Sequence, residues 1–217
     1  MDGETGGLIG KRVSRPNAKR LVAGRGRYSD DIQLPRMVHA AFARSPHPHA
    51  RIISIDTSDA AASEGVLCVM TGTELSAICS PWTGGAAHIP ALRAPEQYAM
   101  AVDVARWQGE PVAVVVATSR ALAEDAAELL QIEWDPLPAL SSGEDALDSN
   151  ASSIHPGDAG NLAFEARSGE GEVSAEADIS VAATFRFGRH TGVPLETRAA
   201  VADWNPGDSS LNVYASH

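Results

Sequence analysis

Hydrophobic residues in the first two-thirds of the chain recur with the periods of strands and short helices. Residues 37–44 and 51–56 are predicted as strands, and a further strand begins at Ile132. The apolar runs 66–70 and 112–117 have no alternating polar positions, which is typical of strands covered on both faces. The pattern therefore predicts several strands within the first two-thirds of the chain.

Short helices are predicted between these strands. Residues 59–64 have a capping Thr or Ser before them and Gly65 after them, and Thr71 with Glu74 has capping-box spacing. Ser119 precedes a helix in which three apolar residues share one face: Leu122, Ala126 and Leu129. The strand, helix and strand from 112 to 134 predict a βαβ unit, so residues 37–135 are expected to form a small α/β domain.

The last third of the chain changes in character. Residues 141–176 are rich in Ser, Gly, Asp and Glu and are predicted as a linker. Residues 179–187 alternate as in a half-buried strand, and 198–204 with 211–216 flank a turn, as in a hairpin. Three such strands need a covering layer that the sequence does not supply, so this second domain is expected to be incomplete.

Prolines and paired glycines mark residues 80–98 as a long loop, and loops of this length are usually functional or interfacial. Charge suggests a second binding surface. The net charge is −11, yet residues 1–55 hold ten Lys and Arg against four Asp and Glu. The cations between Lys11 and Arg27 fit either a nucleic-acid-binding tail or an arm that docks on an acidic surface of its own chain or of a partner. Overall acidity and the single interleaved aromatic, Tyr28, favour docking and no nucleic acid.

Targeting and redox signals are few. The N-terminus lacks the pattern of a signal peptide, and the longest apolar run, 111–117, is too short to cross a bilayer. The chain is therefore expected in the cytoplasm, away from membranes. Two cysteines, Cys68 and Cys79, make no disulfide framework, and Cys68 is expected to be a small core residue.

Histidines and carboxylates offer few candidates for chemistry. His47 and His49 would need a third metal ligand, such as His39 or Cys68, which the spacing does not supply, so they are interpreted as loop histidines that form local hydrogen bonds. Single histidines elsewhere are interpreted as solvated or structural: His88, His155 and His190. Acidic residues on the 119–130 helix have the spacing of a solvated face: Glu124, Asp125 and Glu128. Glu196, beside Arg198 at the start of a strand, is expected to cap or to form an ion pair, unless it belongs to a site completed by other chain segments.

Several segments in the same order resemble a known family. They are residues 24–32 (GRGRYSDDI), 34–35, 44–52, 55–57, 107–113 (WQGEPVA), 121–127, 132–138, 194–197 and 211–216. Together they resemble the start of the large, molybdopterin-binding subunit of molybdenum hydroxylases, the family of xanthine dehydrogenase, aldehyde oxidase and aerobic carbon monoxide dehydrogenase. The resemblance spans nearly the whole chain and is specific in combination rather than in any one segment.

The resemblance implies an α+β fold class. Its expected parts are an extended basic arm over residues 1–18, an α/β-hammerhead domain over 19–140, a linker over 141–176 and the truncated start of the first molybdopterin-binding domain over 177–217. In the family, the strand resembling 211–216 leads into a glutamine that contacts the molybdenum centre, and here that position would fall just after His217. The chain is therefore expected to be a split or shortened part of such a subunit.

The resemblance also implies a role. In the complete enzyme, a molybdopterin-type molybdenum cofactor hydroxylates a carbon centre with oxygen from water, and electrons leave through iron–sulfur and FAD partners. This chain is expected to have a structural and assembly role in a hetero-oligomer and to be inactive alone, with no catalytic, cofactor-binding or metal-ligating residue of its own. At most, Glu196 and Arg198 would support a site built by other segments. The alternative is a non-catalytic protein-interaction module.

Overall fold

The computed structural model of the chain describes residues 7, 9–85, 89, 91–155, 157, 160–165, 178–179, 181–188 and 190–216. The chain divides into two compact units, one of residues 37–179 and one that joins residues 1–36 to 180–217. Among the described helices, none combines the length and the hydrophobicity that a membrane crossing requires.

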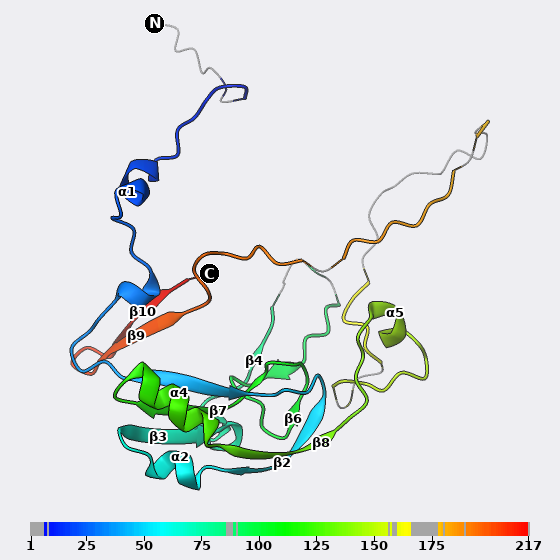
Figure 1. The fold of residues 1–217 in the computed structure, drawn as a ribbon. Helices are drawn as coiled ribbons and strands as arrows, with labels where there is room; N and C mark the ends of the chain where they lie inside the picture. Colours follow the sequence, from blue (N-terminus) through cyan, green and yellow to red (C-terminus); the bar gives the residue numbers. More distant parts are fainter. Residues whose placement is uncertain are drawn as a thin grey trace, which may run out of the picture. The chain divides into compact units, whose positions relative to one another are not determined.

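Two antiparallel sheets form the body of the 37–179 unit (Figure 1). The first has the order β1-β7-β3, with the strands His39–Arg44, Pro111–Ala117 and Val66–Thr71. The second has the order β6-β2-β8, with the strands Val104–Ala105, Ala50–Asp56 and Gln131–Pro136. The strands predicted at 37–44, 51–56, 66–70, 112–117 and 132–134 are thereby confirmed.

The predicted βαβ unit is wrong. The strands β7 and β8 belong to different sheets, and every pairing in both sheets is antiparallel. A βαβ unit would place its two strands in one parallel sheet. Since β7 already has β1 and β3 on its two sides, β8 pairs with β2 instead.

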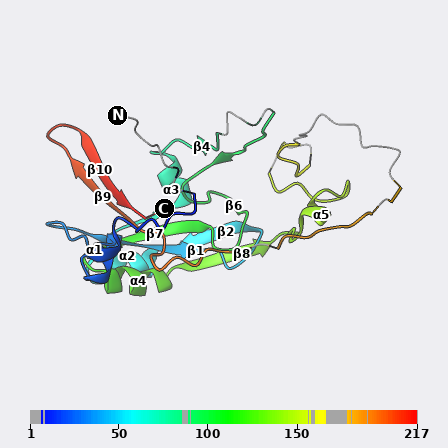
Figure 2. The ribbon, with the colours of Figure 1, turned by 90° about the horizontal axis from the view of Figure 1, so that it is seen from above.

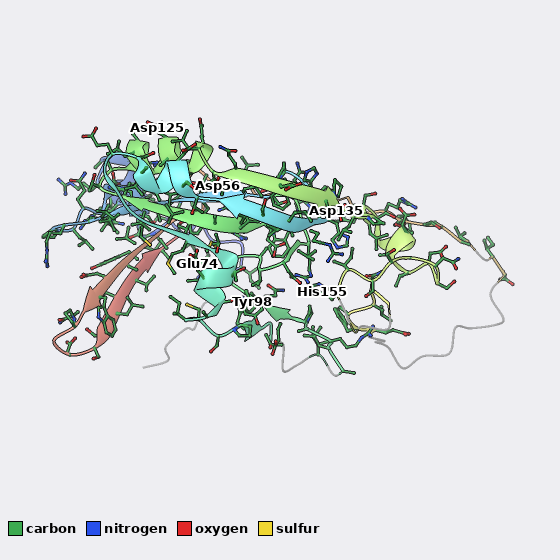
Figure 3. All side chains as sticks on the ribbon, turned by 90° about the horizontal axis from the view of Figure 1, so that it is seen from below. Asp56, Glu74, Tyr98, Asp125, Asp135 and His155 are labelled. Carbon is green, nitrogen blue, oxygen red and sulfur yellow. The ribbon has the colours of Figure 1, made fainter. Side chains whose placement is uncertain are left out.

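Helices cover the first sheet from opposite sides. The helices α2 (Ser58–Ala62) and α4 (Arg120–Glu128) lie on one side, and α3 (Gly72–Ser76) lies on the other (Figures 2 and 3). Ala60, Val115 and Ala126 meet in the core beneath α2 and α4. Small side chains let the helices approach the sheet closely, so this part of the core forms against β7.

Capping residues set where the helices begin. The amide of Leu122 donates to Ser119 Oγ at 3.3 Å, and the amide of Thr71 donates to Glu74 Oε2 at 2.7 Å. The hydrogen bonds from Thr71 lower the pKa of the Glu74 carboxyl. At Gly72 a Cβ would lie 1.8 Å from the carbonyl oxygen of Ala101, so only glycine permits this approach of α3 to the 100–101 backbone.

The expectation that residues 66–70 are covered on both faces is wrong, and so is the assignment of Cys68 to the core. Leu67 is 59% exposed and Cys68 is also exposed. A bulge shifts the pairing between Val66 and Cys68, and α2 and α4 cover only one side of the sheet here (Figure 3). The apolar run thus predicts the strand correctly, but it does not predict that one face of the strand stays exposed to solvent.

Short elements occupy the predicted loop and linker. Within residues 80–98, β4 (Trp82–Thr83) pairs with β5 (Glu96–Gln97). Within the linker, α5 (Gly143–Ala146) begins where the amide of Asp145 donates to Ser142 Oγ at 3.0 Å.

The other unit contains α1 (Ala18–Val22), the 3-10 turn η1 (Ser29–Asp31) and a hairpin of β9 (Ala200–Asn205) and β10 (Ser210–Ala215). The hairpin confirms the prediction, with Leu211 opposite Trp204 and Val213 opposite Ala202. The strand predicted at 179–187 is wrong, because residues 181–188 form no strand. A lone extended segment has no neighbour for its backbone hydrogen bonds, and β9 and β10 pair with each other.

Candidate functional site

Glu196 connects the segment before β9 to the N-terminal turn of the same unit. Its Oε1 accepts a hydrogen bond from the amide of Ser29 at 2.7 Å. The neighbouring amide of Tyr28 donates to Asp31 Oδ2 at 2.9 Å. These carboxylates satisfy amides at the start of η1 that have no partner within the turn. The expected capping role of Glu196 is confirmed, although the capped turn lies far away in the sequence.

Arg198 does not share this contact. Its side chain is exposed, and among the described residues no ion pair joins it to Glu196. The polar groups next to it are used by the hairpin: Ser216 Oγ donates to the carbonyl of Thr197 at 2.7 Å and accepts from the amide of Ala199 at 2.9 Å. The structure therefore places Glu196 in a structural contact and leaves Arg198 available.

The turn that contains both neighbouring histidines ties the two sheets of the 37–179 unit together. Ser45 pairs with the 109–110 backbone, because its amide donates to the carbonyl of Glu110 and its carbonyl accepts from Gly109. His49 is buried, and its Nδ1 lies 2.7 Å from the carbonyl oxygen of Pro138. His47 packs its ring edge against Trp134, with 5.7 Å between ring centroids. The interpretation of local hydrogen bonding is corrected for His49, whose partner follows the distant strand β8.

Metal ligands do not gather in the part of the chain that the structure describes, where no three His, Cys, Asp or Glu side chains are placed to hold an ion. The prediction for the acidic helix is confirmed: Glu124, Asp125 and Glu128 are exposed, and Glu124 pairs with Arg120 at 2.8 Å.

Glu110, immediately before β7, is the most deeply buried carboxylate described, with 5% exposure. Its Oε2 accepts from the amide of Arg106 at 2.5 Å. Burial raises the pKa of Glu110, and hydrogen bonds from the backbone of Arg106 and Trp107 oppose this rise together with the Arg106 charge. Glu110 thus fixes the 106–110 turn from inside and is held in a costly buried position.

Beside this turn lies a hollow of about 370 Å³. Its charged lining residues are Glu96, Asp103, Arg106 and Glu110, and its aromatic ones are Tyr98, Trp107 and His155. Tyr98 and His155 lie on the side of the sheets opposite Asp125 of α4 (Figure 3).

The remaining histidines are placed as follows. His155 lines the hollow, which the interpretation as a solvated or structural residue did not anticipate. His190 packs against Phe187, with ring centroids 5.1 Å apart. His88 lies outside the described residues.

Comparison with known proteins places the chain. Residues 23–138 match the family model of the aldehyde oxidase and xanthine dehydrogenase a/b hammerhead domain, and residues 154–217 match that of the molybdopterin cofactor-binding domain. The chain belongs to the aldehyde oxidase and xanthine dehydrogenase family. The resemblance to molybdenum hydroxylase large subunits and the α+β fold with a hammerhead domain are thereby confirmed.

Relatives of this family are similar over almost the whole chain. The nicotine 6-hydroxylase large subunit of Paenarthrobacter nicotinovorans is 36% identical over 98% of this chain and 26% of its own length. The quinoline 2-oxidoreductase of Pseudomonas putida 86 superposes with a TM-score of 0.83 at 38% identity, covering 94% of this chain and 26% of that one. The aldehyde oxidoreductase of Desulfovibrio gigas gives 0.76 at 28% identity, covering 93% and 23%. The chain spans about a quarter of the length of the curated relatives that it matches.

The match of residues 154–217 to a molybdopterin-binding domain raises the question of which of their atoms could hold the cofactor. A cofactor site would leave buried polar atoms waiting for a ligand. Among the described residues, the buried side-chain nitrogen or oxygen without a partner is Arg106 Nε, which lies outside this range. The described side chains of 154–217 thus show no such orphaned buried atom.

Sequence reasoning missed the hollow and its turn. Residues 107–113 (WQGEPVA) are identified from the sequence only by their resemblance to the family. Glu110 lies there between Gly109 and Pro111, directly before a run of apolar residues. A carboxylate directly before a predicted buried strand is a signal that could have identified this turn, since charged side chains are rarely buried without partners.

Proposed function

We propose that this chain is the N-terminal portion of the molybdopterin-binding subunit of a molybdenum-dependent hydroxylase or dehydrogenase, with a structural and assembly role. The observation that carries this proposal is the order of two matches, hammerhead domain first and molybdopterin-binding domain second. The described side chains provide packing and turns rather than a reactive cluster, which suits a supporting role. The proposed parts are those expected from the sequence: arm 1–18, hammerhead 19–140, linker 141–176 and domain start 177–217.

Within this role, Glu196 and Arg198 are proposed to support a cofactor site completed by other segments. Glu196 suits the role because its bond to Ser29 fixes the chain just before β9. Arg198 suits it because its side chain is exposed and available for a later contact. In the complete enzyme the molybdenum cofactor supplies the oxidation chemistry.

The proposed partners are the remaining molybdopterin-binding segment and the iron–sulfur and flavin subunits of a hetero-oligomer. Two relatives from Paenarthrobacter nicotinovorans support assembly by their names, a large subunit and a subunit gamma of a dehydrogenase complex. Both cysteines of the chain are unpaired, which suits a reducing compartment, and we propose the cytoplasm.

Elemental analysis tests the proposal. The purified chain alone is expected to hold no stoichiometric molybdenum or zinc. Co-expression with the remaining part of a relative's subunit, about three-quarters of its length, is expected to yield a complex with one molybdenum. Molybdenum bound stoichiometrically to the chain alone, or no complex in co-expression, would contradict the proposed role.

A further inference from the structure

The hollow beside the 106–110 turn has the size of a site for a small ligand. Its volume of about 370 Å³ lies at the lower end of the range for ligand pockets, roughly 300–1,000 Å³. Its walls come from the backbone around β5 and β6 and from the turn that Glu110 fixes. Asn161 helps to hold the wall that carries His155, since its Oδ1 accepts from the amide of Ile154 at 2.9 Å.

Arg106 lines this hollow and has side-chain N–H donors that the described residues leave without an acceptor. Its side chain is 20% exposed, and among the described residues it donates one hydrogen bond, from Nη1 to the carbonyl of Val104 at 3.1 Å. Nη2 lies 3.9 Å from Asp103 Oδ1, which is beyond hydrogen-bonding distance, and Nε is buried without a partner. A guanidinium offers five N–H donors, so an acceptor placed against Nη2 would be favourable.

Carboxylates on the same walls decide the charge of that acceptor. Among the described lining residues, three carboxylates, Glu96, Asp103 and Glu110, face one cation, Arg106. Glu110 Oε2 accepts from the amide of Arg106, whereas Asp103, the loose ion-pair partner of Arg106, has a side chain that is 72% exposed and can accept a hydrogen bond from a ligand. The walls therefore disfavour an anion, while the guanidinium disfavours a cation close to it. A neutral group that has a hydrogen-bond acceptor beside a donor could accept from Arg106 and donate to Asp103.

Aromatic side chains define the rest of the ligand. Trp107 is 45% exposed and Tyr98 is 41% exposed, and both line the hollow. Large aromatic rings left open beside polar groups offer a flat ligand apolar contact as well as orientation.

We propose that this hollow binds a small, neutral aromatic amide, whose carbonyl oxygen accepts from Arg106, whose N–H donates to Asp103 and whose ring lies against Trp107. The proposal goes beyond the proposed molybdenum chemistry and depends on none of it.

Three benzene derivatives of similar size but different charge test the proposal: benzamide, which is neutral, benzoate, an anion, and benzylamine, a cation. Each is titrated into the 15N-labelled full chain at neutral pH, and the indole N–H signals are followed by NMR. Benzamide is expected to shift the Trp107 signal saturably, with a Kd at least tenfold lower than those of the two charged ligands, while the Trp82 signal stays in place. Tight binding of benzylamine or of benzoate would overturn the proposal, and so would the absence of a saturable shift.

Variants assign the contacts. Arg106→Gln is expected to weaken benzamide binding about tenfold, the usual effect of losing a hydrogen bond to a charged group. Asp103→Asn changes an exposed side chain that the fold does not need and is expected to weaken binding about fivefold. The matched control is Arg51→Gln, from an exposed pair with Asp135 at 3.8 Å, which should leave the Kd unchanged. Equal weakening by Arg51→Gln, or unchanged binding in Asp103→Asn, would contradict the assigned contacts.

Discussion

The strand β7 and residues 181–188 are both rich in apolar residues, yet they differ in structure. In β7, Val112 and Val115 are completely buried, and strands pair with both sides of the backbone. In the second segment, Val181, Phe185 and Phe187 are each more than 85% exposed, and residues 181–188 form no strand. An alternating or apolar pattern therefore indicates which face of a segment can be buried. Whether a strand forms depends on neighbouring strands with which the segment can pair.

The largest effect is expected when the same substitution is made in both regions. Val115→Asp places a charge in the core beneath α2 and α4 and should lower the free energy of unfolding by about 4 kcal/mol or more. Val181→Asp, on an exposed side chain, should change it by less than about 0.5 kcal/mol. Urea unfolding followed by circular dichroism measures both. Similar losses in the two variants would show that residues 181–188 are packed in solution.

The second-largest effect is expected on the self-association of the chain. Exposed apolar side chains drive self-association, because burying each large one is worth roughly 1.5–3 kcal/mol. We expect the chain alone to oligomerise or aggregate, and we expect the double variant Phe185→Ser, Phe187→Ser or deletion of residues 177–217 to make it largely monomeric. Light scattering over a concentration series gives the result. A chain that remains monomeric at high concentration would mean that these residues are already covered.

A smaller effect is expected where Glu196 meets Ser29. Glu196→Ala removes the acceptor of the Ser29 amide and should destabilise that unit by about 1 kcal/mol. Arg198→Ala serves as the control, since its exposed side chain has no such contact. Hydrogen exchange at the Ser29 amide should accelerate in the first variant and not in the second. Unchanged protection in Glu196→Ala would rule out the contact as a stabilising one.

The smallest effect concerns pH. Because burial raises the pKa of Glu110 in the folded chain, the folded state holds this proton more tightly than the unfolded state. Its contribution therefore lowers stability as pH rises above about 4.3, the ordinary glutamate value. Glu110→Gln should remove this loss, so the stability of the variant relative to the unaltered chain should increase from pH 4 to pH 7. A relative stability that stays constant or decreases would contradict the assigned direction.

Much of the hammerhead body could be predicted because its signals are local. Thr71, Glu74 and Ser119 make the capping contacts that their spacing indicates. The strand β7 is buried as its unbroken apolar run predicts. Such contacts depend on residues a few positions apart, so the sequence alone contains the necessary information.

Sheet order and the polar contacts across the fold could not be predicted in the same way. Nothing near β8 indicates that β2 rather than β7 is its partner, and nothing near His49 indicates Pro138. The bond from Ser29 to Glu196 joins residues that one sequence window cannot compare. The hollow is missed for the same reason, since its walls come from separate loops.

Hydrogen exchange of the full chain, read by mass spectrometry, tests the contrast between the two regions most directly. We predict that amides of β7, residues 111–117, are the slowest to exchange, because β7 pairs with a strand on each side and its side chains are mostly buried. We also predict that residues 181–188 exchange nearly as fast as an unstructured peptide. Strong protection of 181–188, or rapid exchange throughout β7, would contradict the account.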